Sequence, residues 1–135
     1  MYLLDTNILL ELLLDQDRAD EVEQFIRERA HLYVSDFSFH SLGVILLRGG
    51  HPDIFLRVSQ DLFVRGGVGL LSLEVEDMEA VVQAAQRFRL DFDDAYQYVA
   101  AEKHDLTLIS FDGDFDRTDR GRQTPAEVLA GDDVH

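Results

Sequence analysis

Short hydrophobic runs alternate with longer amphipathic segments along the whole chain. The apolar runs predict four buried strands at residues 2–4, 31–34, 68–73 and 106–110. Apolar residues at helical spacing predict helices between them, at 6–14, up to 29, 35–48, 53–65, 75–89 and 92–104, with a short terminal helix at 126–129. Asp15 or Asp17 can cap the second of these helices, and Ser35 the third.

Strands that alternate with helical segments favour a parallel sheet with helices on both faces. The sequence therefore predicts a three-layer α/β/α fold with about four to five parallel strands. It contains no internal repeat or linker-like tract, and its only prolines are Pro52 and Pro125. We expect one domain over residues 1–135.

Composition narrows the class of protein. The hydrophobic fraction is 46%, which fits a folded chain. No apolar run is long enough to cross a membrane, and no signal-like segment opens the chain, so the expected location is the cytoplasm. Cysteine is absent, which excludes disulfides, zinc–thiolate sites and thiolate nucleophiles.

The charge balance bears on which ligands the protein can bind. Lys and Arg number 12 against 27 Asp and Glu, a formal net charge of −15. Proteins that grip nucleic acid through a broad basic face are not expected to be this acidic. Either the acids form a solvated surface, or some of them converge and hold a cation.

Three acidic groups fall near strand or helix ends where they can converge. Asp5 follows the first predicted strand, and Asp112 and Asp114 follow the fourth. A third group, residues 91–94, opens a predicted helix; Asp91 and Asp93 fit simple helix-start roles, whereas Asp94 can point at the sheet edge. Crowded carboxylates need a cation, and an oxygen-only cluster suits Mg²⁺ or Mn²⁺. Metal-assisted phosphodiester hydrolysis uses such a site, and the ion reverses the local charge so that an acidic protein can handle RNA.

Four segments resemble the PIN-domain family in order and spacing. They are Met1-Tyr2-Leu3-Leu4-Asp5-Thr6-Asn7 with the apolar run after it, Asp91-Phe92-Asp93-Asp94-Ala95, Leu106 to Phe115, and Thr124-Pro125-Ala126-Glu127-Val128-Leu129. Each motif alone is weak, but together they cover nearly the whole chain. The resemblance implies a Mg²⁺- or Mn²⁺-dependent endoribonuclease like the small VapC-like toxins, with RNA as substrate, an antitoxin partner and a homodimeric state.

The resemblance also implies roles for individual residues. Asp5, Asp94 and Asp112 would be catalytic metal ligands, and Asp114 would position water or a second ion. Thr6 or Asn7 would hold metal-bound water or brace the loop, and Asp93 would be auxiliary.

One position departs from the family pattern. Where the family usually has a glutamate, the helix at 35–48 has Ser41, flanked by His40. The remaining three acids can suffice for one ion, or Asp36, His40 or Ser41 can substitute. Alternatively, the domain has weak activity, or it has lost catalysis and binds nucleic acid or protein.

Basic and apolar residues supply the remaining candidates. Arg117, Arg120 and Arg122 follow the acidic loop, and we expect them to line the RNA path, although they can also pair with nearby acids. Candidates for a dimer or antitoxin surface, which core packing explains equally well, are Ile8, Leu12, Leu13, Val44 and Leu47.

Overall fold

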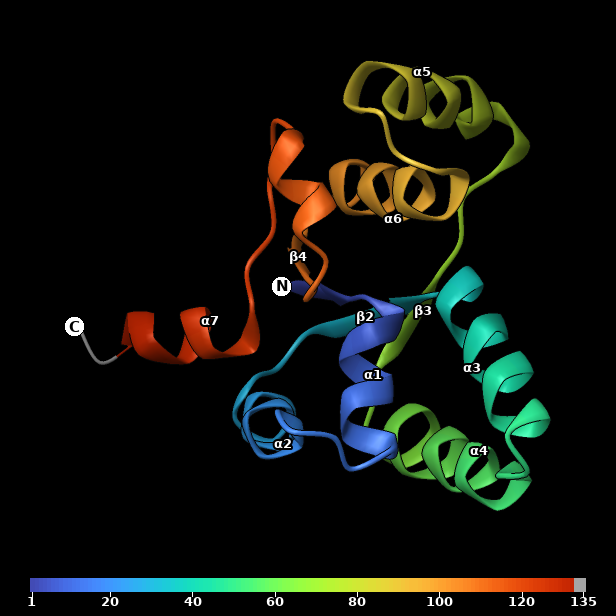
Figure 1. The fold of residues 1–135 in the computed structure, drawn as a ribbon, viewed down its shortest axis with the longest axis vertical. Helices are drawn as coiled ribbons and strands as arrows, with labels where there is room; N and C mark the ends of the chain where they lie inside the picture. Colours follow the sequence, from blue (N-terminus) through green and yellow to red (C-terminus); the bar gives the residue numbers. More distant parts are fainter. Residues whose placement is uncertain (133–135) are drawn as a thin grey trace.

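The computed structural model describes residues 1–132 as a sheet with helices packed on both faces (Figure 1). The strands are β1 (Tyr2–Leu4), β2 (Leu32–Ser35), β3 (Gly69–Leu71) and β4 (Thr107–Ile109). The α-helices are α1 (Thr6–Leu13), α2 (Ala19–Glu28), α3 (Asp36–Arg48), α4 (Pro52–Val58), α5 (Met78–Phe88), α6 (Phe92–Lys103) and α7 (Pro125–Asp132). A π-helix (Ser59–Arg65) continues α4, and 3-10 helices cover Val75–Asp77 and Gly113–Arg117.

The sheet is parallel throughout and has the strand order β3-β2-β1-β4. On the central strand β1, Tyr2 pairs with Leu32 of β2 on one side and with Thr107 of β4 on the other. The predicted parallel α/β/α architecture is confirmed, with the four strands found close to their predicted positions.

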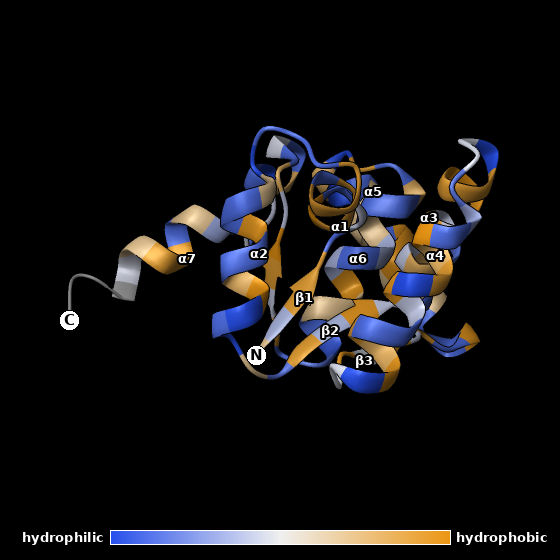
Figure 2. Ribbon diagram, turned by 90° about the horizontal axis from the view of Figure 1, so that it is seen from below, coloured by the Kyte–Doolittle hydropathy of each residue, from blue (hydrophilic) through white to orange (hydrophobic). Residues whose placement is uncertain are grey.

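Each face of the sheet has its own hydrophobic core. Leu3 and Leu4 are both fully buried and lie in different cores, because successive side chains of a strand point to opposite faces. Helices α5 and α6 cover the face with Leu3, whereas α1, α2 and α3 cover the face with Leu4. Figure 2 shows the hydrophobic strands at the centre and hydrophilic stretches on the outer side of α2.

Two local predictions need correction. The segment predicted as one helix at 53–65 is an α-helix as far as Val58 and a π-helix from Ser59 onward. The Ser59 hydroxyl donates to the Phe55 carbonyl at 2.8 Å, a local contact that competes with the regular helical pattern. The second predicted helix starts only at Ala19, after Arg18, so neither Asp15 nor Asp17 caps it.

No helix in residues 1–132 is long and apolar enough to cross a membrane. The single domain over residues 1–135 stays a prediction, and residues 133–135 lie outside the described part of the chain.

Candidate metal centre

The acidic residues lie next to β1, the strand from which the sheet is extended on both sides. The chain leaves β1 toward β2 on one side, whereas β4 pairs with β1 on the other side. Ligand sites of parallel sheets lie at such points, beyond the carboxyl ends of the strands. Asp5 directly follows β1, and residues 110–114 follow β4, so the sheet topology itself brings them together.

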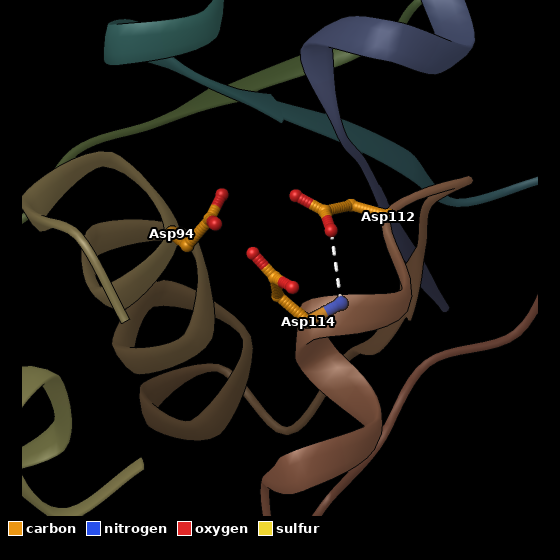
Figure 3. Close-up of side chains that lie close together, drawn as sticks. All are labelled: Asp94, Asp112 and Asp114. Atoms are coloured by element: carbon orange, nitrogen blue, oxygen red, sulfur yellow. Dashed lines mark hydrogen bonds between the residues drawn. The ribbon is translucent and has the colours of Figure 1, made fainter. Parts of the chain in front are cut away.

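Three carboxylates form a tight cluster at this edge. Asp94 from α6, Asp112 from the loop after β4 and Asp114 from the 3-10 helix each offer an oxygen within 4.8 Å of the others. Figure 3 shows these side chains pointing toward one another. The Asp114 amide donates to Asp112 Oδ1 at 2.9 Å, so Asp112 caps the 3-10 helix that carries Asp114.

Helix α6 places Asp94 in its first turn. Asp91 is the N-cap of α6, and its side chain accepts the Asp94 amide at 3.1 Å. Partial burial, followed by repulsion from Asp91, Asp112, Asp5 and Asp114, raises the pKa of Asp94 to about 7. A cation bound beside such a carboxyl group would stabilise its ionised form and offset the repulsion.

Asp5 lies behind the cluster and is 7% exposed. It caps α1: its Oδ1 accepts the Thr6 amide at 2.8 Å and Gln97 Nε2 at 2.9 Å, while its Oδ2 accepts the Ser110 hydroxyl at 2.7 Å. Burial raises the pKa of Asp5, and these three hydrogen bonds oppose that shift. The carboxylate is therefore held in one orientation by neutral donors.

Gln97 was not singled out from the sequence, yet it is central to this arrangement. It is 1% exposed, and it reaches Asp5 across 92 positions of the chain. Its spacing offered one signal: it lies one helical turn after Asp94, and it is the only side-chain amide in the buried run from Ala95 to Ala101.

Thr6 and Asn7 brace the surrounding loops. Thr6 Oγ1 lies 2.8 Å from the Ser38 hydroxyl of α3. Asn7 donates to the Ser110 hydroxyl at 3.3 Å and accepts the Phe111 amide at 3.2 Å. These contacts tie the start of α1 to α3 and to the loop that leads to Asp112.

The acids open into a pocket of about 280 Å³. Its lining includes four of the five predicted acids and auxiliary acids, Asp5, Asp93, Asp94 and Asp112, together with Thr6, Asn7, Gln97 and Ser41. Leu10, Phe37 and Ile45 form its apolar side. His40, although adjacent to Ser41 in sequence, is exposed and lines a separate apolar groove on α3 and α4 with Phe39 and Phe55. The structure thus brings Ser41 to the acids and not His40.

The three arginines predicted to line an RNA path have partners within the protein. Arg117 donates to Asp114 at 3.2 Å and to the carbonyls of Phe88 and Arg89 at 3.0 and 2.6 Å. Arg120 pairs with Asp105 and donates to the Leu106 carbonyl. Arg122 pairs with Asp116 and donates to the Ser110 carbonyl. Arg117 and Arg122 thus brace the acidic loop and its 3-10 helix, and Arg117 contacts Asp114 directly, whereas Arg120 is tied to the segment before β4.

The donor set fits a hard divalent cation. The cluster consists of carboxylate oxygens with no nitrogen or sulfur ligand, which is the chemistry of Mg²⁺ and Mn²⁺ sites. The ion could be held by Asp94, Asp112 and Asp114, with Asp5 adjoining them in the pocket.

Comparisons with solved structures agree with this fold. The chain resembles the solved structure of a toxin–antitoxin complex from Klebsiella pneumoniae, at 24% identity and a TM-score of 0.75, over 93% of this chain and 98% of that one. It resembles FitAcB from Neisseria gonorrhoeae at 21% identity and a TM-score of 0.76, over 93% and 99%. It also resembles VapC20 of Mycobacterium tuberculosis, described as a toxin that cleaves the sarcin–ricin loop, at 16% identity and a TM-score of 0.74, over 86% and 93%.

These identities are low, and the structural likenesses therefore show the fold. No curated protein sequence matches the chain. The family model for the PIN domain, however, matches residues 2–121. The chain therefore belongs to the PIN domain family.

Proposed function

We propose that this protein is a divalent-metal-dependent endoribonuclease, with Mg²⁺ or Mn²⁺ as its cofactor. The observation that carries the proposal is the convergence of Asp94, Asp112 and Asp114 at the carboxyl edge of a PIN-domain sheet, where Asp94 and Asp112 also line a pocket. When bound, such an ion activates water and offsets negative charge on the phosphodiester.

The position of each residue indicates its role in the proposed site. Asp94 from α6 and Asp112 from the loop after β4 would hold the ion. Asp114 is exposed and contacts Arg117, and its carboxylate lies beside those of Asp94 and Asp112, where it would orient water. Asp5 supports the ion from the buried side. Asp93, Thr6, Asn7 and Ser41 are auxiliary, and His40 lies outside this pocket.

The test starts with the metal alone. We expect saturable Mn²⁺ binding to metal-free protein in a calorimetric titration, and loss of that binding in Asp112→Asn and Asp94→Asn. Asp17→Asn is the matched control, because Asp17 is exposed in the loop between α1 and α2. Absence of saturable binding to the wild-type protein would contradict a preformed metal site.

Cleavage is tested separately with a mixed-sequence RNA, with and without EDTA. Metal-dependent cleavage that is lost in Asp112→Asn supports the nuclease. Metal binding without cleavage of any RNA tested would favour the alternative, a PIN domain that binds nucleic acid or protein without catalysis. The observation that favours this alternative is that Ser41, which has no charge, lines the pocket where the family usually has a glutamate.

We further propose that the protein is the toxin of a toxin–antitoxin pair, acts in the cytoplasm and forms a homodimer. The Klebsiella structure that it resembles is a toxin–antitoxin complex. Of the apolar residues considered for a dimer or antitoxin surface, Ile8 is fully buried, whereas Leu47 is 57% exposed beside an apolar groove of about 500 Å³ on α3 and α4. Co-purification with the product of an adjacent gene tests the pair, and light scattering of the isolated protein tests the dimer.

A further inference from the structure

The amide of Gln97 is fixed from both ends. Its Oε1 accepts the Ser35 hydroxyl at 2.6 Å, and its Nε2 donates to the Ser38 hydroxyl at 2.7 Å and to Asp5 Oδ1 at 2.9 Å. Only the NH₂ end can donate to a carboxylate, so the orientation of the amide follows from its partners. Ser35 is itself held because its hydroxyl accepts the Ser38 amide at 3.1 Å as the N-cap of α3.

The hydrogen bonds to Asp5 leave its two oxygens unequal. A carboxylate offers about four lone pairs, two on each oxygen. Oδ1 accepts two hydrogen bonds, from the Thr6 amide and from Gln97, whereas Oδ2 accepts one, from Ser110. One lone pair, on Oδ2, is therefore left for a cation, and a bidentate contact through both oxygens is blocked.

This asymmetry bears on the choice of ion. Mg²⁺ demands a near-octahedral shell at short distances, whereas Ca²⁺ accepts more oxygens and readily takes carboxylates in bidentate fashion. Mn²⁺ also takes six oxygen ligands in an octahedral arrangement. A carboxylate that can offer only one lone pair favours the octahedral ions.

We propose that Gln97 is a positioning residue that sets the metal preference of the site, because it restricts Asp5 to monodentate contact. The inference rests on the proposed metal site and goes beyond it, since it assigns selectivity to a neutral residue outside the acidic cluster. Removing the amide frees one lone pair of Oδ1, while the Thr6 amide still occupies the other, so both oxygens of Asp5 can then contact one ion and discrimination against Ca²⁺ is relaxed.

Gln97→Met tests the proposal, because methionine keeps the volume and shape of the side chain and lacks the donor. The measurement is the ratio of the Ca²⁺ and Mn²⁺ dissociation constants by calorimetry on metal-free protein. We expect Mn²⁺ affinity to fall about tenfold, the size usual for residues that orient metal ligands, and Ca²⁺ affinity to fall less. The ratio then moves toward Ca²⁺.

The matched control is Tyr96→Phe, one residue earlier on α6. It removes the hydroxyl that donates to Asp36 at 2.8 Å and accepts the Leu73 amide at 2.9 Å, and it leaves the contacts of Asp5 intact. We expect it to lower thermal stability without changing the ratio. If Gln97→Met does not fold, Gln97→Leu, which is also uncharged and lacks the amide donor, carries the same expectation.

The outcomes separate this inference from the proposed function. Wild-type protein that binds Mn²⁺, together with a Gln97→Met ratio within twofold of wild type, would overturn the positioning role alone. Wild-type protein that binds neither ion would overturn both. An equal shift of the ratio in Tyr96→Phe would overturn the assignment to Gln97, since general loosening of α6 would then explain it.

Discussion

Neutralising Asp94 should stabilise the metal-free protein while it abolishes metal binding. In the folded chain the pKa of Asp94 is raised from 3.8 to about 7, first by burial and then by the surrounding carboxylates. Between these two pH values the folded protein binds a proton that the unfolded chain has released. Stability therefore falls as pH rises through this window, and levels off once Asp94 is ionised in both states. Asp94→Asn removes this pH-dependent loss.

The magnitude follows from the shift. A pKa change from 3.8 to about 7 corresponds to at most about 4 kcal/mol of opposition to ionisation. Asp94 is only half-buried, and solvent screens the repulsion, so we expect about 1–2 kcal/mol. The variant should be more stable than wild type by this amount at pH 8 in EDTA, and by nearly nothing at pH 4.

Urea unfolding at several pH values, with and without Mn²⁺, measures both parts of the effect. Asp17→Asn controls for the loss of one negative charge from a chain with net charge −15. Saturating Mn²⁺ should reverse the order of stability, because the ion stabilises only the folded form that binds it. A variant that is less stable than wild type at pH 8 in EDTA would refute the claim that the neighbours of Asp94 oppose its ionisation.

Three further substitutions test other parts of the site. Arg117→Met removes the side chain that holds Asp114 and two backbone carbonyls, so urea unfolding in EDTA should show a loss of about 1–2 kcal/mol, and calorimetry a weaker Mn²⁺ affinity. Ser41→Glu adds a carboxylate to the pocket, which should raise Mn²⁺ affinity about tenfold and lower metal-free stability; unchanged affinity would show that position 41 does not reach the ion. Phe115→Ala deletes a fully buried ring from the 3-10 helix and should cost about 3–5 kcal/mol in urea unfolding; a loss below about 1 kcal/mol would contradict its role as the anchor of that helix.

The fold could be predicted from the sequence because local pattern and tertiary environment agree. The strand at Tyr2–Leu4 is a short apolar run, and both of its faces are buried by helices. The helix at Asp36–Arg48 begins at the serine that caps it and ends at the glycine pair. The π-helix at Ser59–Arg65 escaped prediction because its apolar spacing is still helical, and only the contact of Ser59 with the preceding turn distinguishes it.

The sequence pointed to the acids of the candidate site and to Thr6, Asn7 and Ser41, but not to the buried donors that hold Asp5. Asp5 and Asp112 follow strands, and parallel strands deliver the residues that follow them to one edge. Gln97 and Ser110 carry no charge, and their roles depend on contacts with Asp5 across 92 and 105 positions of the chain. Contacts between residues so far apart produce no repeating pattern in the sequence, so they could not be predicted from it. For the arginines after the acidic loop, the sequence left open an RNA path and pairing with nearby acids, and the structure shows ion pairs with Asp114, Asp105 and Asp116.

Charge and geometry make separable contributions to this centre. Burial and then repulsion among the acids oppose ionisation in the metal-free protein, as the raised pKa of Asp94 shows, and a bound cation would offset this opposition. Neutral donors on Asp5 contribute little charge but restrict how its oxygens can be used. Asp94→Asn should therefore change metal affinity and metal-free stability in opposite directions, whereas Gln97→Met should change the preference between ions. If both variants altered affinity for every ion in the same proportion, charge alone would account for the site.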